Sequence, residues 1–111
     1  MSGVRSMPQL FIYETLRSHS LIKKLIGEVP AYEPATIRGY ERVTYRIEGD
    51  DYETLEPSHR KVVPLVRGDV LNLTNAELKK LDHWESRYSR RQLPTSAGEA
   101  WVYLLKDYSE A

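Results

Sequence analysis

The chain contains no cysteine, which excludes a disulfide scaffold, a thiol nucleophile and a cysteine-ligated metal. It also lacks an excess of either charge, since 16 Lys and Arg residues balance 16 Asp and Glu residues. A balanced chain has no net field that would draw it to nucleic acid or to an anionic membrane. No apolar run approaches the roughly 20 residues of a membrane span, and residues 1–9 lack the apolar segment of a signal peptide. We therefore expect a soluble, cytoplasmic protein.

The composition is that of an ordinary globular domain. Of 111 residues, 41% are hydrophobic and 10% are aromatic, which is enough for one core. A chain of this length rarely holds two cores. We expect a single domain spanning residues 1–111, while the oligomeric state stays open.

The N-terminal half alternates strand and helix signals. Residues 9–13 are apolar and β-prone, typical of a buried strand, and the spacing of apolar residues over 20–26 predicts a short amphipathic helix. The β-branched stretch 35–47, interrupted at Gly39, predicts two short strands or one bent strand. Residues 48–61 have few apolar anchors, and we expect an exposed loop there that is either a functional lid or simply mobile.

The C-terminal half has the clearest local signals. Strands are expected at 62–66 and 69–73, hinged at Gly68. Thr74 and Glu77 have the spacing of a capping box, which predicts a helix from about 77 to 84. Residues 88–94 and 99–105 then form a hairpin whose last strand is apolar on both faces, as in a strand inside a barrel or between layers. The fold class is α+β: a small mixed, partly closed β-barrel with two short helices.

Other kinds of site have little support. No two histidines have metal-ligand spacing with each other or with acids, and no serine lies in a nucleophile-elbow pattern. Arginines interleave with aromatic residues over 84–91, as in a single-strand nucleic-acid binder. The neighbouring acids Asp82 and Glu85 and the zero net charge favour a solvated strand face instead. The expected partners thus include no nucleic acid, no membrane and no metal.

Two segments, together with looser matches near 33–40, 70–73 and 100–103, give the chain a family resemblance. Residues 10–17 (LFIYETLR) are similar to the strand-and-turn pattern LFVYGTLR of the gamma-glutamylcyclotransferase-like (AIG2-like) family. Residues 81–90 (LDHWESRYSR) resemble that family's LDxFExxYxR, which follows the capped helix. The matches occur in order over nearly the whole chain.

The resemblance implies an activity and a site. Members of the family cyclise the gamma-glutamyl group of small peptides or amines, releasing 5-oxoproline and the free amine. It implies that the turn formed by Tyr13, Glu14, Thr15 and Leu16 holds the glutamyl group, partly through backbone amides. It also implies that Glu85 removes a proton from the α-amino group of the substrate.

Physical chemistry is consistent with that role for Glu85. A free glutamate, with a pKa of about 4.3, is a weak base for an ammonium group. Trp84 and Tyr88 nearby could desolvate the carboxylate and raise its pKa toward the working pH. The reaction is intramolecular and needs neither a metal nor an organic cofactor. Tyr88 is either a substrate contact or a half-buried strand aromatic, and Glu85 is either the base or a surface acid paired with Arg87 or Arg90.

Glu14 departs from the family pattern, which has glycine at that position. Glycine allows a positive φ or a close approach of backbone to ligand, whereas a glutamate adds a negative charge where a carboxylate should bind. The loop is therefore reshaped, or the substrate preference has changed, or activity is lost. The leading hypothesis is a gamma-glutamyl cyclotransferase. The alternatives are a catalytically degenerate ligand-binding or protein-interaction module and, third, acyl transfer to a different acceptor.

Overall fold

The computed structural model describes residues 7–13 and 18–106, which form seven strands and two helices. In chain order these are β1 (Gln9–Ile12), α1 (His19–Ile26), β2 (Tyr32–Arg38), β3 (Tyr40–Ile47), β4 (Asp50–Pro57), β5 (Leu65–Asn72), α2 (Asn75–Trp84), β6 (Tyr88–Thr95) and β7 (Gly98–Leu105).

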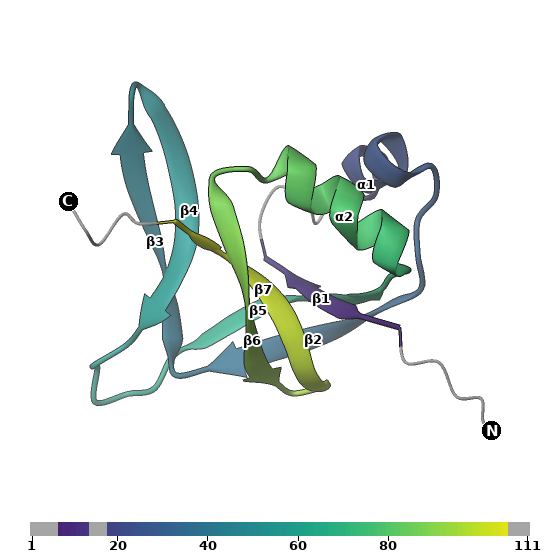
Figure 1. The fold of residues 1–111 in the computed structure, drawn as a ribbon. Coiled ribbons are helices and arrows are strands. Elements are labelled where there is room, and N and C mark those ends of the chain that lie inside the picture. The colour runs from purple at the N-terminus through teal and green to yellow at the C-terminus, as the bar shows by residue number, and fades with distance from the viewer. Residues whose placement is uncertain (1–6, 14–17, 107–111) are drawn as a thin grey trace.

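Five strands form one mixed sheet in the order β2-β5-β1-β7-β6, and β3 pairs with β4 in a separate hairpin (Figure 1). Strands β1 and β7 run parallel, while the other pairings are antiparallel. The loop after β6 reaches back to the far edge strand, because the Ser96 amide donates to the Thr36 carbonyl at 2.9 Å. The sheet therefore curls toward closure without a continuous ladder between its two edges in the described residues. The α+β class with two short helices is confirmed.

Both faces of the central strands are buried. Leu10 and Ile12 of β1 pack with the apolar faces of α1 and α2, whereas Phe11 belongs to a second cluster on the opposite face of the sheet. The same alternation occurs in β7, where Val102 lies in the second cluster and Tyr103 in the first. Successive side chains of a strand point to opposite faces, so the expectation of a last strand that is apolar on both sides is confirmed.

Local capping interactions hold the ends of the helices. Thr74 accepts from the Glu77 amide at 3.0 Å, and the Glu77 carboxylate accepts from the Thr74 amide at 2.9 Å. This is the predicted capping box, and the helix begins two residues earlier than expected. In α1, Ser18 caps the start and Gly27, with φ of +92°, ends the helix in the left-handed conformation.

The prediction of an exposed loop over 48–61 is wrong. Most of that stretch is strand β4, which pairs with β3. The pairing runs from Tyr40 opposite Pro57 to Ile47 opposite Asp50. The two-residue turn between them has positive φ at both Glu48 and Gly49, as a tight hairpin turn requires. Cross-strand pairing along the whole length of β3, rather than apolar content, makes this segment a strand.

The two strands expected to hinge at Gly68 are one continuous strand, β5, and residues 62–64 precede it. Gly68 is not a hinge but a position where β5 lies tightly against β1. A side-chain carbon at position 68 would overlap the Ile12 carbonyl oxygen and lie 2.7 Å from the Phe11 ring. Glycine is needed there because two backbones approach each other.

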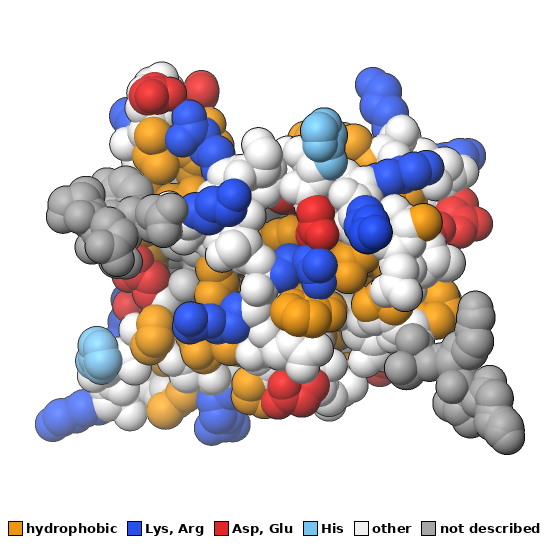
Figure 2. Space-filling model, viewed as in Figure 1, with side chains coloured by type: hydrophobic (Ala, Val, Ile, Leu, Met, Phe, Trp, Pro, Cys, Tyr) orange, Lys and Arg blue, Asp and Glu red, His pale blue; other side chains and the backbone are white. Residues whose placement is uncertain are grey.

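The surface carries charges of both signs. Figure 2 shows Lys and Arg side chains spread over the face that is in view and interspersed with acidic and apolar groups. Among the helices in the described part of the chain, neither is long and apolar enough to cross a membrane.

Candidate active site

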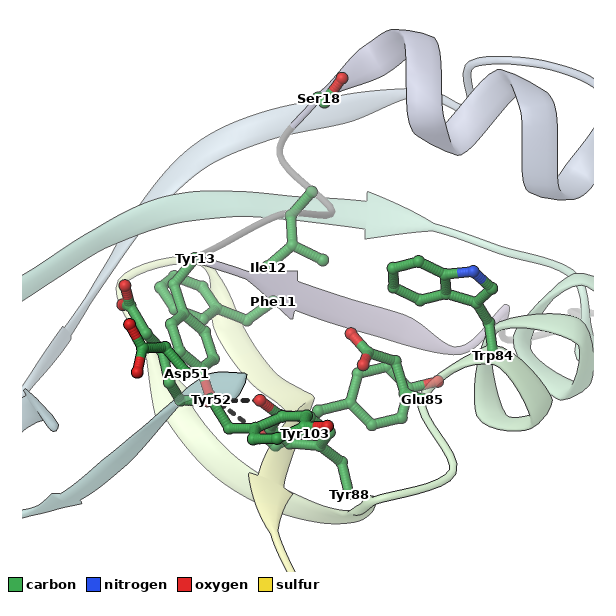
Figure 3. A pocket seen from close by; sticks show the side chains of 11 residues that line it. Phe11, Ile12, Tyr13, Ser18, Asp51, Tyr52, Trp84, Glu85, Tyr88 and Tyr103 are labelled. Carbon is green, nitrogen blue, oxygen red and sulfur yellow. Dashed lines mark hydrogen bonds between the residues drawn. The ribbon is translucent and has the colours of Figure 1, made fainter. Parts of the chain in front are cut away.

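A cavity of about 740 Å³ opens between the end of β1, the end of α2 and the β3–β4 hairpin (Figure 3). Its wall combines aromatic rings with acidic groups: Phe11, Ile12, Tyr13, Ser18, Asp51, Tyr52, Glu53, Trp84, Glu85, Tyr88 and Tyr103. A concave, mostly apolar cavity with a few polar groups directed into it is the usual form of a small-molecule site.

Tyr13 follows the last residue of β1 and is fixed against the neighbouring strand. Its side chain is buried, and its hydroxyl donates to the Tyr103 carbonyl oxygen of β7 at 2.7 Å. Tyr13 therefore contributes a rigid ring to the cavity at the point where the chain leaves the sheet.

Glu85 lies at the C-terminal cap of α2. Its amide donates to the Leu81 carbonyl at 2.8 Å, and its own carbonyl accepts from the Tyr88 amide at 2.9 Å. The backbone of Glu85 is thus held both by the helix that precedes it and by the strand that follows. Side chains on such doubly held positions keep their direction better than side chains on free loops.

The Glu85 carboxylate is half-buried in the cavity beside the Trp84 indole (Figure 3). Burial raises the pKa of Glu85 from 4.5 to about 7, because an apolar setting disfavours the charged form. A carboxylate with such a pKa accepts protons near neutral pH, as a general base must.

The alternative of an ordinary surface ion pair for Glu85 does not fit the observed contacts. Arg87 pairs with Glu48 at 3.0 Å, and Arg90 pairs with Asp82 at 2.7 Å. Both arginines considered as partners of Glu85 are therefore engaged elsewhere.

The wall opposite Glu85 comes from the hairpin. Asp51, Tyr52 and Glu53 of β4 line the cavity. The Tyr88 hydroxyl donates to the Glu53 carbonyl at 2.8 Å and so ties the hairpin to β6. Sequence analysis missed this wall, because a segment read as an exposed loop gives no pairing from which its side chains could be placed.

The structure brings together three of the predicted site residues, Tyr13, Glu85 and Tyr88, although they are up to 75 positions apart in sequence. Glu14, Thr15 and Leu16 lie outside the described residues. Tyr103 and Trp84 also line the cavity; Trp84 was considered only as a neighbour that desolvates Glu85, and Tyr103 only as part of an apolar strand.

The acids at this cavity do not form a metal-binding cluster. Across residues 7–13 and 18–106, no group of three His, Cys, Asp or Glu side chains converges as metal ligands would. Among the described residues, the cavity offers to a ligand the Glu85 carboxylate, whose pKa is raised, the acidic residues Asp51 and Glu53 on the opposite wall and a set of aromatic rings.

Comparison of the sequence with known proteins identifies a family. Residues 10–111 match the family model described as gamma-glutamyl cyclotransferase, AIG2-like. AIG2-like protein D of Arabidopsis thaliana is 30% identical over 95 residues, which are 84% of this chain and 59% of that relative. The chain thus spans somewhat over half the length of the curated relative.

Solved structures agree on the fold. A solution structure of an Arabidopsis thaliana protein superposes with a TM-score of 0.76 at 23% identity, covering 95% of this chain and 72% of the other. The crystal structure of YkqA from Bacillus subtilis gives 0.63 at 21% identity, covering 90% of this chain and 36% of the other. With the family model matching nearly the whole sequence, the chain belongs to the AIG2-like gamma-glutamyl cyclotransferase family.

Proposed function

We propose that this protein is a gamma-glutamyl cyclotransferase that releases 5-oxoproline and a free amine from a small gamma-glutamyl amine or peptide, with Glu85 as general base. The observation that carries the proposal is the carboxylate of Glu85, half-buried and with a pKa raised to about 7, in a cavity shared with the end of β1. Family membership supports the reaction class.

The reaction removes protons from the attacking nitrogen, adds one to the departing nitrogen and closes one ring. Glu85 takes a proton from the α-amino group of the substrate, whose nitrogen then attacks the γ-carbonyl carbon. The carbon–nitrogen bond to the departing amine breaks as that nitrogen accepts the proton that Glu85 took, the attacking nitrogen releases its second proton to solvent, and the five-membered lactam remains. Atoms balance without an oxidant, a water molecule or a cofactor.

Most of the acceleration would come from holding the substrate folded. An intramolecular attack in a near-attack geometry can save about 7–11 kcal/mol relative to free reactants. The aromatic rings of Tyr13, Trp84 and Tyr88 give the cavity rigid walls for that purpose. The Tyr88 hydroxyl is already bonded to the Glu53 carbonyl, so Tyr88 offers the substrate its ring.

The glutamyl carboxylate needs a separate anchor. The lining drawn from the described residues contains acids and aromatic rings but no Lys or Arg. We assign the anchor to the backbone amides of Glu14, Thr15 and Leu16, as the family resemblance implies, because successive backbone amides can bind an anion. Such amides also stabilise the oxyanion that develops on the γ-carbonyl.

The test is direct. The purified protein is incubated with a panel of gamma-glutamyl amines and peptides, and 5-oxoproline is measured by mass spectrometry. Glu85→Gln keeps the shape of the side chain but removes the base, and we expect a loss of about 10²–10⁴-fold in kcat/KM. Glu33→Gln, at an exposed position on β2, is the matched control for loss of one acid. Equal activity of Glu85→Gln and wild type would overturn the assignment.

The second candidate function is a binding module without catalysis, and the glutamate at position 14 is the feature that favours it. Glu14→Gly restores the residue that the family pattern has in this turn. Product formed only by Glu14→Gly would mean that the natural chain binds its ligand without turning it over. Product formed by the wild type, and abolished by Glu85→Gln, would rule out that function.

A further inference from the structure

A second feature lies on the other side of the cavity wall from Glu85. Arg90 of β6 donates two hydrogen bonds to the Asp82 carboxylate, at 2.7 and 3.1 Å. The Tyr103 hydroxyl of β7 donates a third, at 2.7 Å, to the same carboxylate. We refer to Arg90, Asp82 and Tyr103 as the Asp82 clamp.

The Asp82 clamp reaches the cavity through Tyr103. The ring of Tyr103 lines the cavity (Figure 3), while its hydroxyl is bonded to Asp82 behind the wall. Burial and the bond to Asp82 raise the pKa of Tyr103 above its ordinary value of 10, so the hydroxyl stays protonated as a donor. Its backbone carbonyl also accepts the Tyr13 hydroxyl, which extends the connection to β1.

The position of Asp82 in the sequence ties the clamp to Glu85. Asp82 lies three residues before Glu85, and residues with this spacing are neighbours on a helix surface. The clamp therefore fastens the last turn of α2 to β6 and β7 immediately before the cap that carries Glu85. Arg90 is itself held in place, because its guanidinium lies 4.5 Å from the centre of the Trp101 ring.

Charge balance is the second consequence of the clamp. The titratable side chains that line the cavity together with Glu85 belong to Tyr13, Asp51, Tyr52, Glu53, Tyr88 and Tyr103. Asp82 would add another negative charge from its own helix. Arg90 cancels that charge through a bidentate contact, the strong geometry for a guanidinium and a carboxylate.

We propose that Asp82 is a positioning residue for Glu85: held by Arg90 and Tyr103, it fixes the end of α2 against β6 and β7, while Arg90 neutralises its charge beside the cavity. The proposal deepens the proposed function, since it rests on Glu85 being the base. It assigns a role to three residues that need not touch the substrate.

The decisive experiment titrates Glu85 directly. Protein carrying ¹³C-labelled glutamate is titrated by NMR, and Glu85→Gln identifies the Glu85 carboxyl signal. Asp82→Asn leaves Arg90 unbalanced and should lower the pKa of Glu85 by about 0.5–1, a Coulomb effect at neighbouring positions. Arg90→Gln leaves Asp82 unbalanced and should raise the pKa by a similar amount. The double variant should return close to wild type.

Two further variants separate charge from shape. Arg91→Gln removes an arginine at the next, exposed position of β6 and should leave the pKa of Glu85 unchanged. Tyr103→Phe keeps the ring in the cavity but removes one bond to Asp82. It should lower kcat more than it changes KM. In kinetics, the pH of half-maximal kcat/KM should move with the titrated pKa of each variant.

The outcomes discriminate between the two proposals. Shifts of the same sign in Asp82→Asn and Arg90→Gln, or no shift in folded protein, would overturn the role of the clamp. If one variant fails to fold, the sign of the pKa shift in the other still tests the charge balance, and the effect of Tyr103→Phe on kcat still tests the positioning role. If Asp82→Asn and Arg90→Gln shift the pKa of Glu85 in opposite directions but the protein makes no 5-oxoproline, the role of the Asp82 clamp stands and the proposed cyclotransferase reaction is wrong.

Discussion

The wall of the cavity that carries Glu85 and the wall formed by the β3–β4 hairpin are held by different kinds of contact. The Glu85 wall is part of the main sheet and its helices, with a capped helix, a bonded backbone on both sides of Glu85 and the Asp82 clamp behind it. The hairpin is a separate two-stranded sheet. It meets the main sheet through a few contacts, among them the bonds from Tyr88 to Glu53 and from the Leu105 amide to Thr54.

This difference suggests a division of labour. In the hairpin only Thr54 and Leu55 are buried, whereas three of the four residues of β1 are. A hairpin of this kind opens at a lower free-energy cost than a central strand does. The proposed base therefore lies on the more rigid wall. The β3–β4 hairpin, which covers the cavity on the opposite side, opens more readily. The raised pKa of Glu85 depends on both walls, because burial is its cause.

The largest effect that contrasts the two regions should come from glycine substitutions. Gly68→Ala places a side-chain carbon against the Ile12 backbone and the Phe11 ring, and we expect a loss of about 3 kcal/mol in the free energy of unfolding. Gly49→Ala, at the hairpin turn with φ of +89°, meets no atom and should cost about 1 kcal/mol from backbone strain alone. Urea unfolding measures both. Equal costs would show that the main sheet is no tighter than the hairpin.

The next effect concerns stability and pH at the rigid wall. The folded state holds the Glu85 proton up to about pH 7, whereas an unfolded glutamate releases it near 4.5. Stability is therefore lost as pH rises through this window, and the cost is complete above pH 7. At pH 8 the free energy of unfolding of Glu85→Gln should exceed that of the wild type by about 1–2 kcal/mol, after allowance for partial exposure of Glu85 to solvent. At pH 4 the two free energies should be equal.

Measuring the free energy of unfolding of the wild type and of Glu85→Gln at pH 4 and at pH 8 tests this prediction. Glu33→Gln again serves as the control for removing an acid from an exposed strand. A gain for Glu85→Gln that is the same at pH 4 and pH 8 would mean that burial of the charge is not its source.

The smallest effect should appear at the join between the two walls. Tyr88→Phe removes the hydroxyl that bonds to Glu53 and should cost about 1 kcal/mol. In this variant we expect hydrogen exchange to become faster than in the wild type at the β3–β4 amides, and less so at the β1 amides. The pKa of Glu85 should fall toward 4.5 as water enters the cavity. Tyr32→Phe, at an exposed tyrosine of β2, is the matched control. Unchanged exchange in the hairpin would show that other contacts hold it closed.

The features that could be predicted from sequence are those with local causes. The capping box at Thr74 and Glu77 satisfies backbone groups of its own helix, so a stretch of four residues suffices to predict it. The alternation in the last strand indicated burial on both faces without knowledge of its neighbours. The resemblance of residues 10–17 and 81–90 to one family located Tyr13, Glu85 and Tyr88 before their shared cavity was known.

The features that were missed depend on distant partners. Strand β4 is rich in acids, and its structure comes from pairing such as Arg46 with Asp51 across the hairpin. The sequence predicts a hinge at Gly68, but a glycine inside a strand can serve a bend, a bulge or a close approach of another backbone. Only the position of β1 shows that the close approach is the reason here.

The sequence by itself determined the presence of both helices and the capping box of the second, the buried character of the central strands and the membership of a family with a known reaction class. Only the tertiary structure decided that Glu85 faces the end of β1 across a cavity, that a hairpin closes the opposite wall, and that Arg90 engages Asp82 and leaves Glu85 unpaired by either neighbouring arginine. The reason is physical: capping and alternation act over a few residues, whereas burial and charge pairing depend on which segments the fold brings together.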